Sequence, residues 1–142
     1  MKKIKKRKVA VFDIDGTIFR SSLLIELVEA LILEGVFPSG AKRFYTRAYS
    51  RWLDRKDGYD KYIDGVIRAF EANINGVRRK DFLRVAKKVV GFHKNRIYRY
   101  TRDLVKDLKK RGYYLLAISH SPQYAASAFA KTLGFDKVYG RL

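Results

Sequence analysis

The sequence predicts an α/β fold in which a parallel sheet is interrupted by a helical insertion after its first strand. Three observations support this prediction. An apolar, β-branched run, "VAVFD", lies near the start of the chain, and roughly ninety residues with helical spacing follow it. The chain then returns to a strand, a helix and a short strand, an order that favours parallel strands with right-handed crossovers.

The first strand is predicted over residues 7–13, where the apolar centre is typical of a strand covered on both faces. The spacing changes to i, i+3, i+4 and i+7 after Leu23, which predicts an amphipathic helix that stops at Gly35. The apolar positions of this helix are Leu24, Leu27, Val28 and Leu31.

Four further helices are predicted before the second strand. They cover residues 41–55, 59–72, a segment around 82–90, and 98–111, with Gly112 as the C-cap of the last one. The second helix of the insertion carries an aromatic stripe, which we assign to the hydrophobic core rather than to a ligand cage. Its members are Phe44, Tyr45, Tyr49 and Trp52.

The strand pattern returns at residues 113–119, "YYLLAIS". Ser121 is predicted as the N-cap of the next helix, with Pro122 at its first position and Gly134 as its stop. The segment "KVYG" near the end predicts a third, short strand.

The composition suits one globular unit, because 142 residues that are 47% hydrophobic can build one core but hardly two. The absence of cysteine excludes disulfides and thiolate metal sites and suits a reducing cytoplasm, where we expect the protein. The basic start, "MKKIKKRK", is followed by only four apolar residues before Asp13. That run is too short for a signal peptide or a membrane span, so no membrane partner is expected.

The chain carries 32 Lys and Arg against 14 Asp and Glu, a net charge of +18. Such a charge attracts polyanions, anionic membrane surfaces and phosphorylated small molecules. The charges are spread along the chain on polar helix faces, which favours a solvated surface over a dedicated nucleic-acid interface.

Polar residues end both main strands, and ligands of open α/β sheets bind beyond the carboxyl ends of the strands. Asp13 and Asp15 follow the first strand, and Ser119 ends the second just before a helix. Two carboxylates this close need a cation or a shared proton. With Mg²⁺, Asp13 could attack a phosphoryl group while Asp15 acts as acid and base. The alternative is that both aspartates belong to a solvated turn.

Other residues of the same two segments fit that chemistry. Gly16 allows a sharp turn, and Thr17 offers a hydroxyl and an N–H group near the carboxylates. The hydroxyl of Ser119 would hold phosphoryl oxygens. His120 is a candidate for substrate contact, although an exposed loop histidine is the simpler interpretation.

The segment "VAVFDIDGTI" resembles the first motif of the haloacid dehalogenase superfamily, and "LLAISHSP" is similar to its second motif. The helical stretch between them resembles the cap of the phosphoserine-phosphatase-like branch, subfamily IB. The resemblance covers all 142 residues and implies a Rossmannoid parallel sheet, partial here, with an α-helical cap inserted after the first strand. It implies a core that begins at 1–20, a cap at 21–97 and a continued core at 98–142.

The resemblance also implies roles for individual residues. Asp13 becomes the nucleophile and a Mg²⁺ ligand, Asp15 the acid and base with its main-chain carbonyl on Mg²⁺, and Ser119 the phosphate binder. Ser22 stands where a phosphoserine phosphatase usually has a glutamate, and Val66 lies near the position of its substrate-binding arginine. Phosphoserine is therefore not expected as the substrate.

The lysine of the family's third motif and the acidic residues of its fourth are expected beyond Leu142. Without them, the activity of this chain alone is expected to be weak. The first strand is then expected to present an unpaired apolar edge, which favours pairing with another chain, including a second copy.

Three functions remain open from the sequence. The first is a Mg²⁺-dependent phosphomonoester hydrolase that acts on a small phosphorylated metabolite through an aspartyl-phosphate intermediate. The second is a basic, non-enzymatic module that binds RNA or another polyanion through helices that carry arginine and tyrosine. The third is a degenerate relative that binds a partner along the sheet edge.

Overall fold

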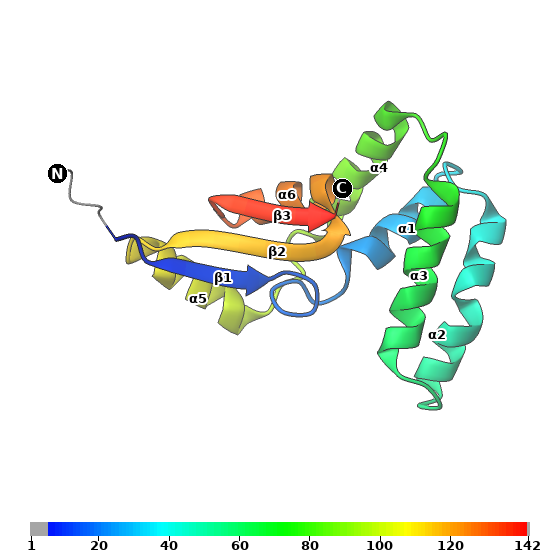
Figure 1. The fold of residues 1–142 in the computed structure, drawn as a ribbon, viewed down its shortest axis with the longest axis horizontal. Helices are drawn as coiled ribbons and strands as arrows, with labels where there is room; N and C mark the ends of the chain where they lie inside the picture. Colours follow the sequence, from blue (N-terminus) through cyan, green and yellow to red (C-terminus); the bar gives the residue numbers. More distant parts are fainter. Residues whose placement is uncertain (1–5, 142) are drawn as a thin grey trace. The chain divides into compact units, whose positions relative to one another are not determined.

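The computed structural model describes residues 6–141 and contains three strands and a series of helices (Figure 1). Residues 1–5 of the basic N-terminal run, and Leu142, lie outside the described part. The elements are β1 (Val9–Asp13), α1 (Leu23–Leu33), the 3₁₀ helix η1 (Ser39–Phe44), α2 (Thr46–Leu53), α3 (Tyr59–Asn73), α4 (Arg79–His93), α5 (Arg99–Lys110), β2 (Tyr114–Pro122), α6 (Gln123–Thr132) and β3 (Lys137–Arg141). The predicted fold class, α/β with helices inserted after the first strand, is confirmed.

The chain forms two compact units. We call the described residues of Met1–Leu23 and Val90–Leu142 the core unit, and Leu24–Val89 the helical unit. None of the described helices combines the length and the apolar composition that crossing a membrane requires.

The sheet of the core unit is parallel and has the order β1-β2-β3 (Figure 1). Val9 lies opposite Tyr114, and Asp13 lies opposite Ile118. The register of β2 with β3 shifts after Ile118. The carboxyl ends of β1 and β2 therefore lie at the same end of the sheet.

The core lies on one face of the sheet. Side chains from the loop after β1, from β2, from α5 and α6, and from the adjoining ends of α1 and α4 form a single buried cluster: Ile14, Ile18, Phe19, Leu23, Val90, Val105, Leu115, Ala117, Ala126, Phe129 and Ala130. The opposite face carries Val9, Val11, Ile118 and Tyr139, which are all exposed. The expectation that the first strand is covered on both faces is thus wrong for the described residues. The connections from β1 to β2 and from β2 to β3 cross the sheet in the same direction. Because such crossovers are right-handed, α5 and α6 pack on the same face of the sheet.

The start of α6 also differs from the prediction. β2 continues through Ser121 to Pro122, and the helix begins at Gln123 with Pro122 as its N-cap residue. No side-chain hydrogen bond caps this helix. Ser121 is not the cap because its hydroxyl donates elsewhere, to Asp15.

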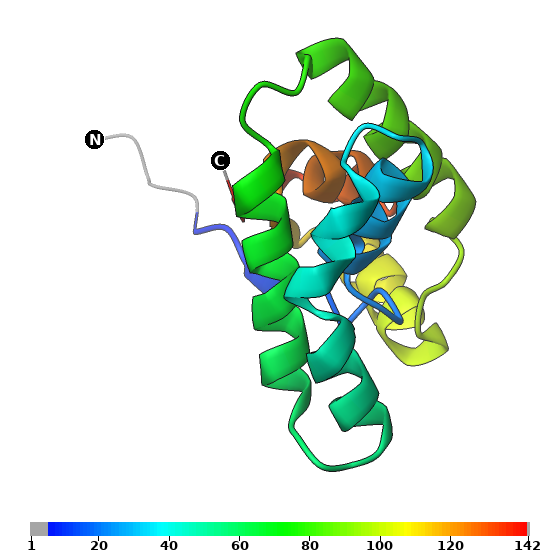
Figure 2. The same ribbon diagram turned by 90° about the vertical axis from the view of Figure 1, so that its right-hand side faces the viewer.

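Helices α1, α3 and α4 each bury an apolar stripe, as the spacing predicts, whereas α2 has no buried residue. Leu27, Val28 and Leu31 of α1 are buried. α3 buries Tyr62, Val66 and Ala69, and α4 buries Val85, Ala86 and Val89. Figure 2 shows α2 and α3 side by side, joined by a short turn.

Aromatic rings hold α2 against α3. The ring of Trp52 stacks on that of Tyr62, with 5.6 Å between centroids, and Tyr49 packs against the same ring at 5.0 Å. Tyr45 is buried, and its hydroxyl donates to Glu29 at 2.6 Å. Burial, together with the nearby charge of Glu29, raises the pKa of Tyr62 to about 12. The stripe therefore packs against α3, although Tyr49 remains partly exposed at its edge.

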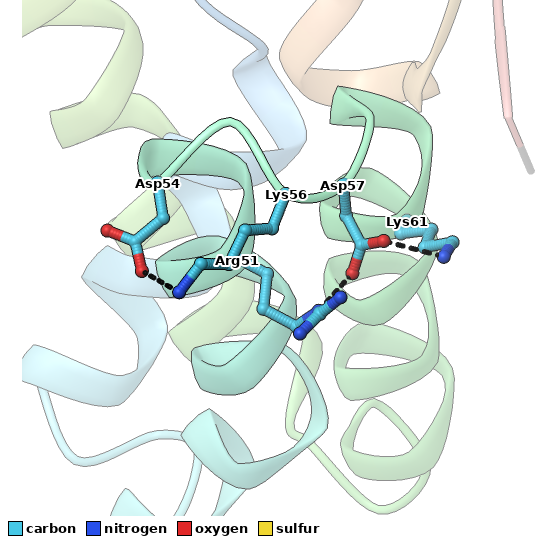
Figure 3. Close-up of polar contacts among 5 residues, drawn as sticks. All are labelled: Arg51, Asp54, Lys56, Asp57 and Lys61. Carbon is cyan, nitrogen blue, oxygen red and sulfur yellow. Dashed lines mark hydrogen bonds and ion pairs between the residues drawn. The ribbon is translucent and has the colours of Figure 1, made fainter.

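Ion pairs fix the turn between α2 and α3 (Figure 3). The carboxylate of Asp57 accepts hydrogen bonds from Arg51 Nε at 2.5 Å and Lys61 Nζ at 2.8 Å, and its side chain is 13% exposed. Hydrogen bonds from these two cations, Arg51 first, lower the pKa of Asp57 to about 2, although burial acts in the opposite direction. Asp54 and Lys56 form a looser, exposed pair at 3.5 Å.

Replacement of Asp57 by Asn is expected to destabilise the protein at neutral pH but not in strong acid. A carboxylate whose pKa is lowered by folding stabilises the folded state above its unfolded pKa of about 4. That contribution is lost as the pH falls from about 4 to about 2. Urea unfolding of both proteins at a series of pH values measures it.

Asp54→Asn is the matched control. Asp54 lies in the same turn, but its ion pair with Lys56 is exposed to solvent and should contribute little to stability. Its unfolding midpoint should stay close to that of the wild type at every pH. A difference between Asp57→Asn and wild type that does not shrink below pH 4 would contradict the assigned ion pairs.

A close backbone contact in the helical unit gives a second prediction. A Cβ atom at Gly65 would lie 2.7 Å from the carbonyl oxygen of Phe44 and 2.9 Å from Cβ of Tyr45. Gly65→Ala should therefore destabilise the protein by about 1–3 kcal/mol through overpacking. Gly91→Ala meets no atom within 4 Å in α4 and should instead stabilise by about 0.5–1 kcal/mol. Thermal unfolding of both variants tests the contrast, and equal stability of the two would refute the contact.

Candidate functional site

The site lies at the carboxyl ends of β1 and β2, within the core unit. Parallel pairing places Asp13 opposite Ile118, next to Ser119. Asp15 follows two residues after Asp13, in the loop that leaves β1. The sheet thus brings together residues that are about a hundred positions apart in the chain, at the strand ends where ligands of open α/β sheets bind.

The loop after β1 is a tight turn held by several backbone hydrogen bonds. The carbonyl oxygen of Ile14 accepts the N–H groups of Thr17, Ile18 and Phe19 at 3.2, 3.0 and 2.9 Å. Gly16 has a φ of +76°, which few other residues adopt readily, and its N–H donates to the carbonyl of Phe19 at 2.9 Å. This geometry fixes where the side chain of Asp15 can lie.

Helix α5 also holds this loop. The hydroxyl of Thr101 donates to the carbonyl oxygen of Thr17 at 2.9 Å. The N–H group of Tyr98, at the start of α5, donates to the carbonyl of Ile18 at 2.9 Å. The loop is therefore tied to the helix that precedes β2 as well as to β2 itself.

The carboxylate of Asp15 is the centre of the hydrogen-bond network. Its Oδ2 atom accepts the hydroxyl of Ser119 at 2.5 Å. Its Oδ1 atom accepts the N–H of Leu23 at 2.7 Å and the hydroxyl of Ser121 at 3.0 Å. Ser119 in turn accepts the N–H of Ser121 at 3.0 Å. Both serines are buried, so these hydroxyls are shielded from bulk water.

Asp13 is in a different environment. Its side chain is exposed, and its Oδ2 atom accepts the hydroxyl of Thr17 at 2.8 Å. Within residues 6–141 no hydrogen bond reaches its Oδ1 atom. The N–H group of Thr17, which the sequence offers as a further donor to the carboxylates, is instead bonded to Ile14. One oxygen of Asp13 is therefore held in place while the other faces solvent.

Ser121 is the residue that sequence reasoning missed, because it was assigned to a helix cap. The signal was present: Ser119 and Ser121 are two residues apart, and residues i and i+2 of a strand point to the same side. His120, between them, points away from both serines and is exposed. It lies in β2 rather than in a loop and forms no polar contact within the described chain.

The residues present fit a partial metal site. Mg²⁺ is held through one or two carboxylates together with waters and substrate phosphate oxygens. The exposed carboxylate of Asp13 can supply a ligand of this kind. Within residues 6–141 no group of three His, Asp or Glu side chains lies close enough to hold a metal ion alone.

The sequence profile of the family described as haloacid dehalogenase-like hydrolase matches residues 10–141. Among curated proteins, none matches the chain. Several solved structures resemble it at low identity.

One of these structures is a phospho-aspartyl intermediate analogue of phosphoserine phosphatase, with 18% identity and a TM-score of 0.47, covering 96% of this chain and 56% of that protein. Another is a putative phosphoglycolate phosphatase from Lactobacillus delbrueckii subsp. bulgaricus, with 24% identity and a TM-score of 0.42, covering 97% and 66%. A third is the putative hydrolase YfnB from Bacillus subtilis, bound to magnesium, with 14% identity and a TM-score of 0.43, covering 96% and 64%.

The chain thus spans between about half and two thirds of the length of these proteins. At these identities and scores, the assignment rests on the match of the family profile, which covers nearly the whole sequence. The chain belongs to the haloacid dehalogenase-like hydrolase family.

Proposed function

We propose that this site hydrolyses phosphomonoesters with the help of Mg²⁺, through an aspartyl-phosphate intermediate on Asp13. The observation that carries the proposal is the contact of Ser119 with Asp15 beside Asp13. A hydroxyl donor, a carboxylate with an unbonded oxygen and a second carboxylate then share one end of the sheet. A phosphoryl group placed there would meet a nucleophile, a hydrogen-bond donor and an acid.

Asp13 is assigned as the nucleophile because Thr17 holds its Oδ2 atom, whereas its Oδ1 atom accepts no hydrogen bond from residues 6–141. That oxygen attacks phosphorus, and the bond from phosphorus to the leaving alcohol oxygen breaks. The alcohol takes a proton from the carboxylic acid of Asp15. A water molecule then attacks the phosphorus, gives a proton to Asp15 and releases phosphate, which restores the carboxylate of Asp13.

Asp15 is assigned as the acid and base because hydroxyl groups, which can rotate, supply two of its three hydrogen bonds. When a phosphoryl oxygen arrives, the hydroxyl of Ser119 can turn from Asp15 to donate to it. The Oδ2 atom of Asp15 is then open to carry the transferred proton. The N–H of Leu23 and the hydroxyl of Ser121 keep the carboxylate oriented meanwhile.

The other carboxylate oxygen of Asp13, Oδ2, and, by the resemblance, the main-chain carbonyl of Asp15 would hold the Mg²⁺. The ion supplies positive charge that offsets the negative charge of the phosphoryl group. The substrate class is a small phosphorylated metabolite.

Asp13→Asn is expected to abolish phosphoryl transfer, because an amide oxygen is a far weaker nucleophile than a carboxylate. With ³²P-labelled p-nitrophenyl phosphate and Mg²⁺, acid quenching should trap a labelled protein whose label is released by hydroxylamine, as an acyl phosphate requires. In the variant, the amount of trapped labelled protein should be lower by about 10³-fold or more. Persistence of the label in Asp13→Asn would end the proposal.

Asp15→Asn serves as the companion variant. It keeps the nucleophile but removes the proton donor and acceptor, so formation and hydrolysis of the labelled species should both slow. A variant with unchanged rates of both steps would contradict the role given to Asp15.

Ser119 and Ser121 allow a matched comparison, because both donate a hydroxyl to Asp15 and only Ser119 is assigned to phosphate. Each change to Ala should destabilise the protein by about 1 kcal/mol, since one hydrogen bond to a carboxylate is lost. Ser119→Ala should also weaken binding of inorganic vanadate roughly ten-fold, whereas Ser121→Ala should change it little. Calorimetry and equilibrium unfolding measure the two effects. Equal vanadate binding by both variants would remove Ser119 from the phosphate site.

A further inference from the structure

The end of the sheet opposite the candidate active site carries a cluster of cations and tyrosines. We call Arg7, Lys8, Arg111, Tyr113 and Tyr114 the cation–tyrosine cluster. All five belong to the core unit and lie where β1 and β2 begin. β1 has five residues, so the cluster is about 16 Å along the strand from Asp13. The two sites are thus separate.

Each cation of the cluster lies over a tyrosine ring. The guanidinium of Arg7 is 4.5 Å from the ring centroid of Tyr114. Arg111 and Lys8 both lie over the ring of Tyr113, at 5.3 and 5.7 Å. The two tyrosines are held in place, because the N–H of Tyr114 donates to the carbonyl of Lys8 at 2.8 Å and Tyr113 packs on the core.

The cluster is short of negative charge. Arg111 reaches Asp107 at 3.3 Å, whereas Arg7 and Lys8 form no ion pair within the described chain. The remaining acidic residues of the core unit are engaged elsewhere: Asp13 and Asp15 in the candidate site, Asp103 with Arg102, and Asp136 with the N–H of Leu115. Two cations over one ring repel each other, and an anion bound between them would relieve that repulsion.

We propose that the cation–tyrosine cluster binds single-stranded nucleic acid. Unpaired bases stack on aromatic rings and on the planes of arginine side chains, and lysines and arginines bind the phosphates between them. The guanidinium over Tyr114 belongs to an exposed side chain, so a base can reach it and stack on it. Lys8 and Arg111 then contact the adjacent phosphates. A second copy of the chain is disfavoured as the partner, because it carries the same net charge of +18.

The proposal differs from binding through the basic helices, because it places the contact at the amino end of the sheet. It does not depend on phosphatase activity. A chain that hydrolyses phosphomonoesters at one end of its sheet can bind a nucleic acid at the other.

The test uses the full chain and fluorescein-labelled oligouridylate and oligothymidylate of about 10 nucleotides, a typical site size for single-strand-binding domains. Anisotropy is measured over a range of salt concentrations. Arg7→Lys keeps the charge but loses the stacked plane, so affinity should fall roughly ten-fold with the salt dependence unchanged. Lys8→Ala should lower the slope of log affinity against log salt by about 0.7. Binding of either oligonucleotide that weakens as salt rises supports the proposal, and binding of neither overturns it.

Two controls carry the same chemical changes in the helical unit, at exposed residues without an ion pair in the described structure: Arg47→Lys and Lys87→Ala. Both should bind as the wild type does, as should Asp13→Asn. Tyr114→Phe should retain affinity and Tyr114→Leu should lose it, with circular dichroism showing that each variant is folded.

The proposal is overturned if Arg47→Lys weakens binding as much as Arg7→Lys, because the effect would then not be specific to the cation–tyrosine cluster. It is overturned equally if duplex DNA binds as tightly as the single strands. Binding to phosphatidylserine vesicles that is lost in Arg7→Lys, without binding of the oligonucleotides, would assign the cluster to a membrane surface instead.

Discussion

The site depends on the hydrogen bonds that Asp15 accepts from β2. Ser119 and Ser121 donate to its two carboxylate oxygens, across 104 and 106 positions of sequence. These bonds hold the loop after β1 against the end of its neighbouring strand. The loop in turn fixes Asp13, whose carboxylate accepts the hydroxyl of Thr17. These hydrogen bonds and the position of Asp13 require that β1 pairs with β2 in parallel, because only that pairing brings the carboxyl ends of both strands to one end of the sheet.

Because the chain has a net charge of +18, the positions of its few acidic residues decide where positive charge is neutralised. In the helical unit single carboxylates hold two cations each, as Asp57 does with Arg51 and Lys61. Glu34 does the same with Arg84 and Lys88, which lower its pKa. In the core unit two aspartates gather at one end of the sheet and the cations of the cation–tyrosine cluster at the other. The two ends therefore differ in electrostatic character, which suits them to different ligands.

Local sequence patterns predicted the elements well wherever one periodicity extended over several turns. The stripe of Leu27, Val28 and Leu31 predicted α1, and the apolar run before Asp13 predicted β1. The boundary of β2 could not be predicted in this way. A serine followed by proline is a common helix start, but hydrogen bonding to Asp15 keeps Ser121 in the strand.

The sequence by itself determined the α/β class, the order of the elements and the two aspartates that end the first strand. Only the tertiary structure decided that Ser121 joins Ser119 on Asp15, that one face of the sheet is exposed, and that cations stack on Tyr113 and Tyr114. The reason is physical. Periodicity and turn residues act over a few positions, whereas strand register and crossover direction set contacts between residues that are far apart in the chain.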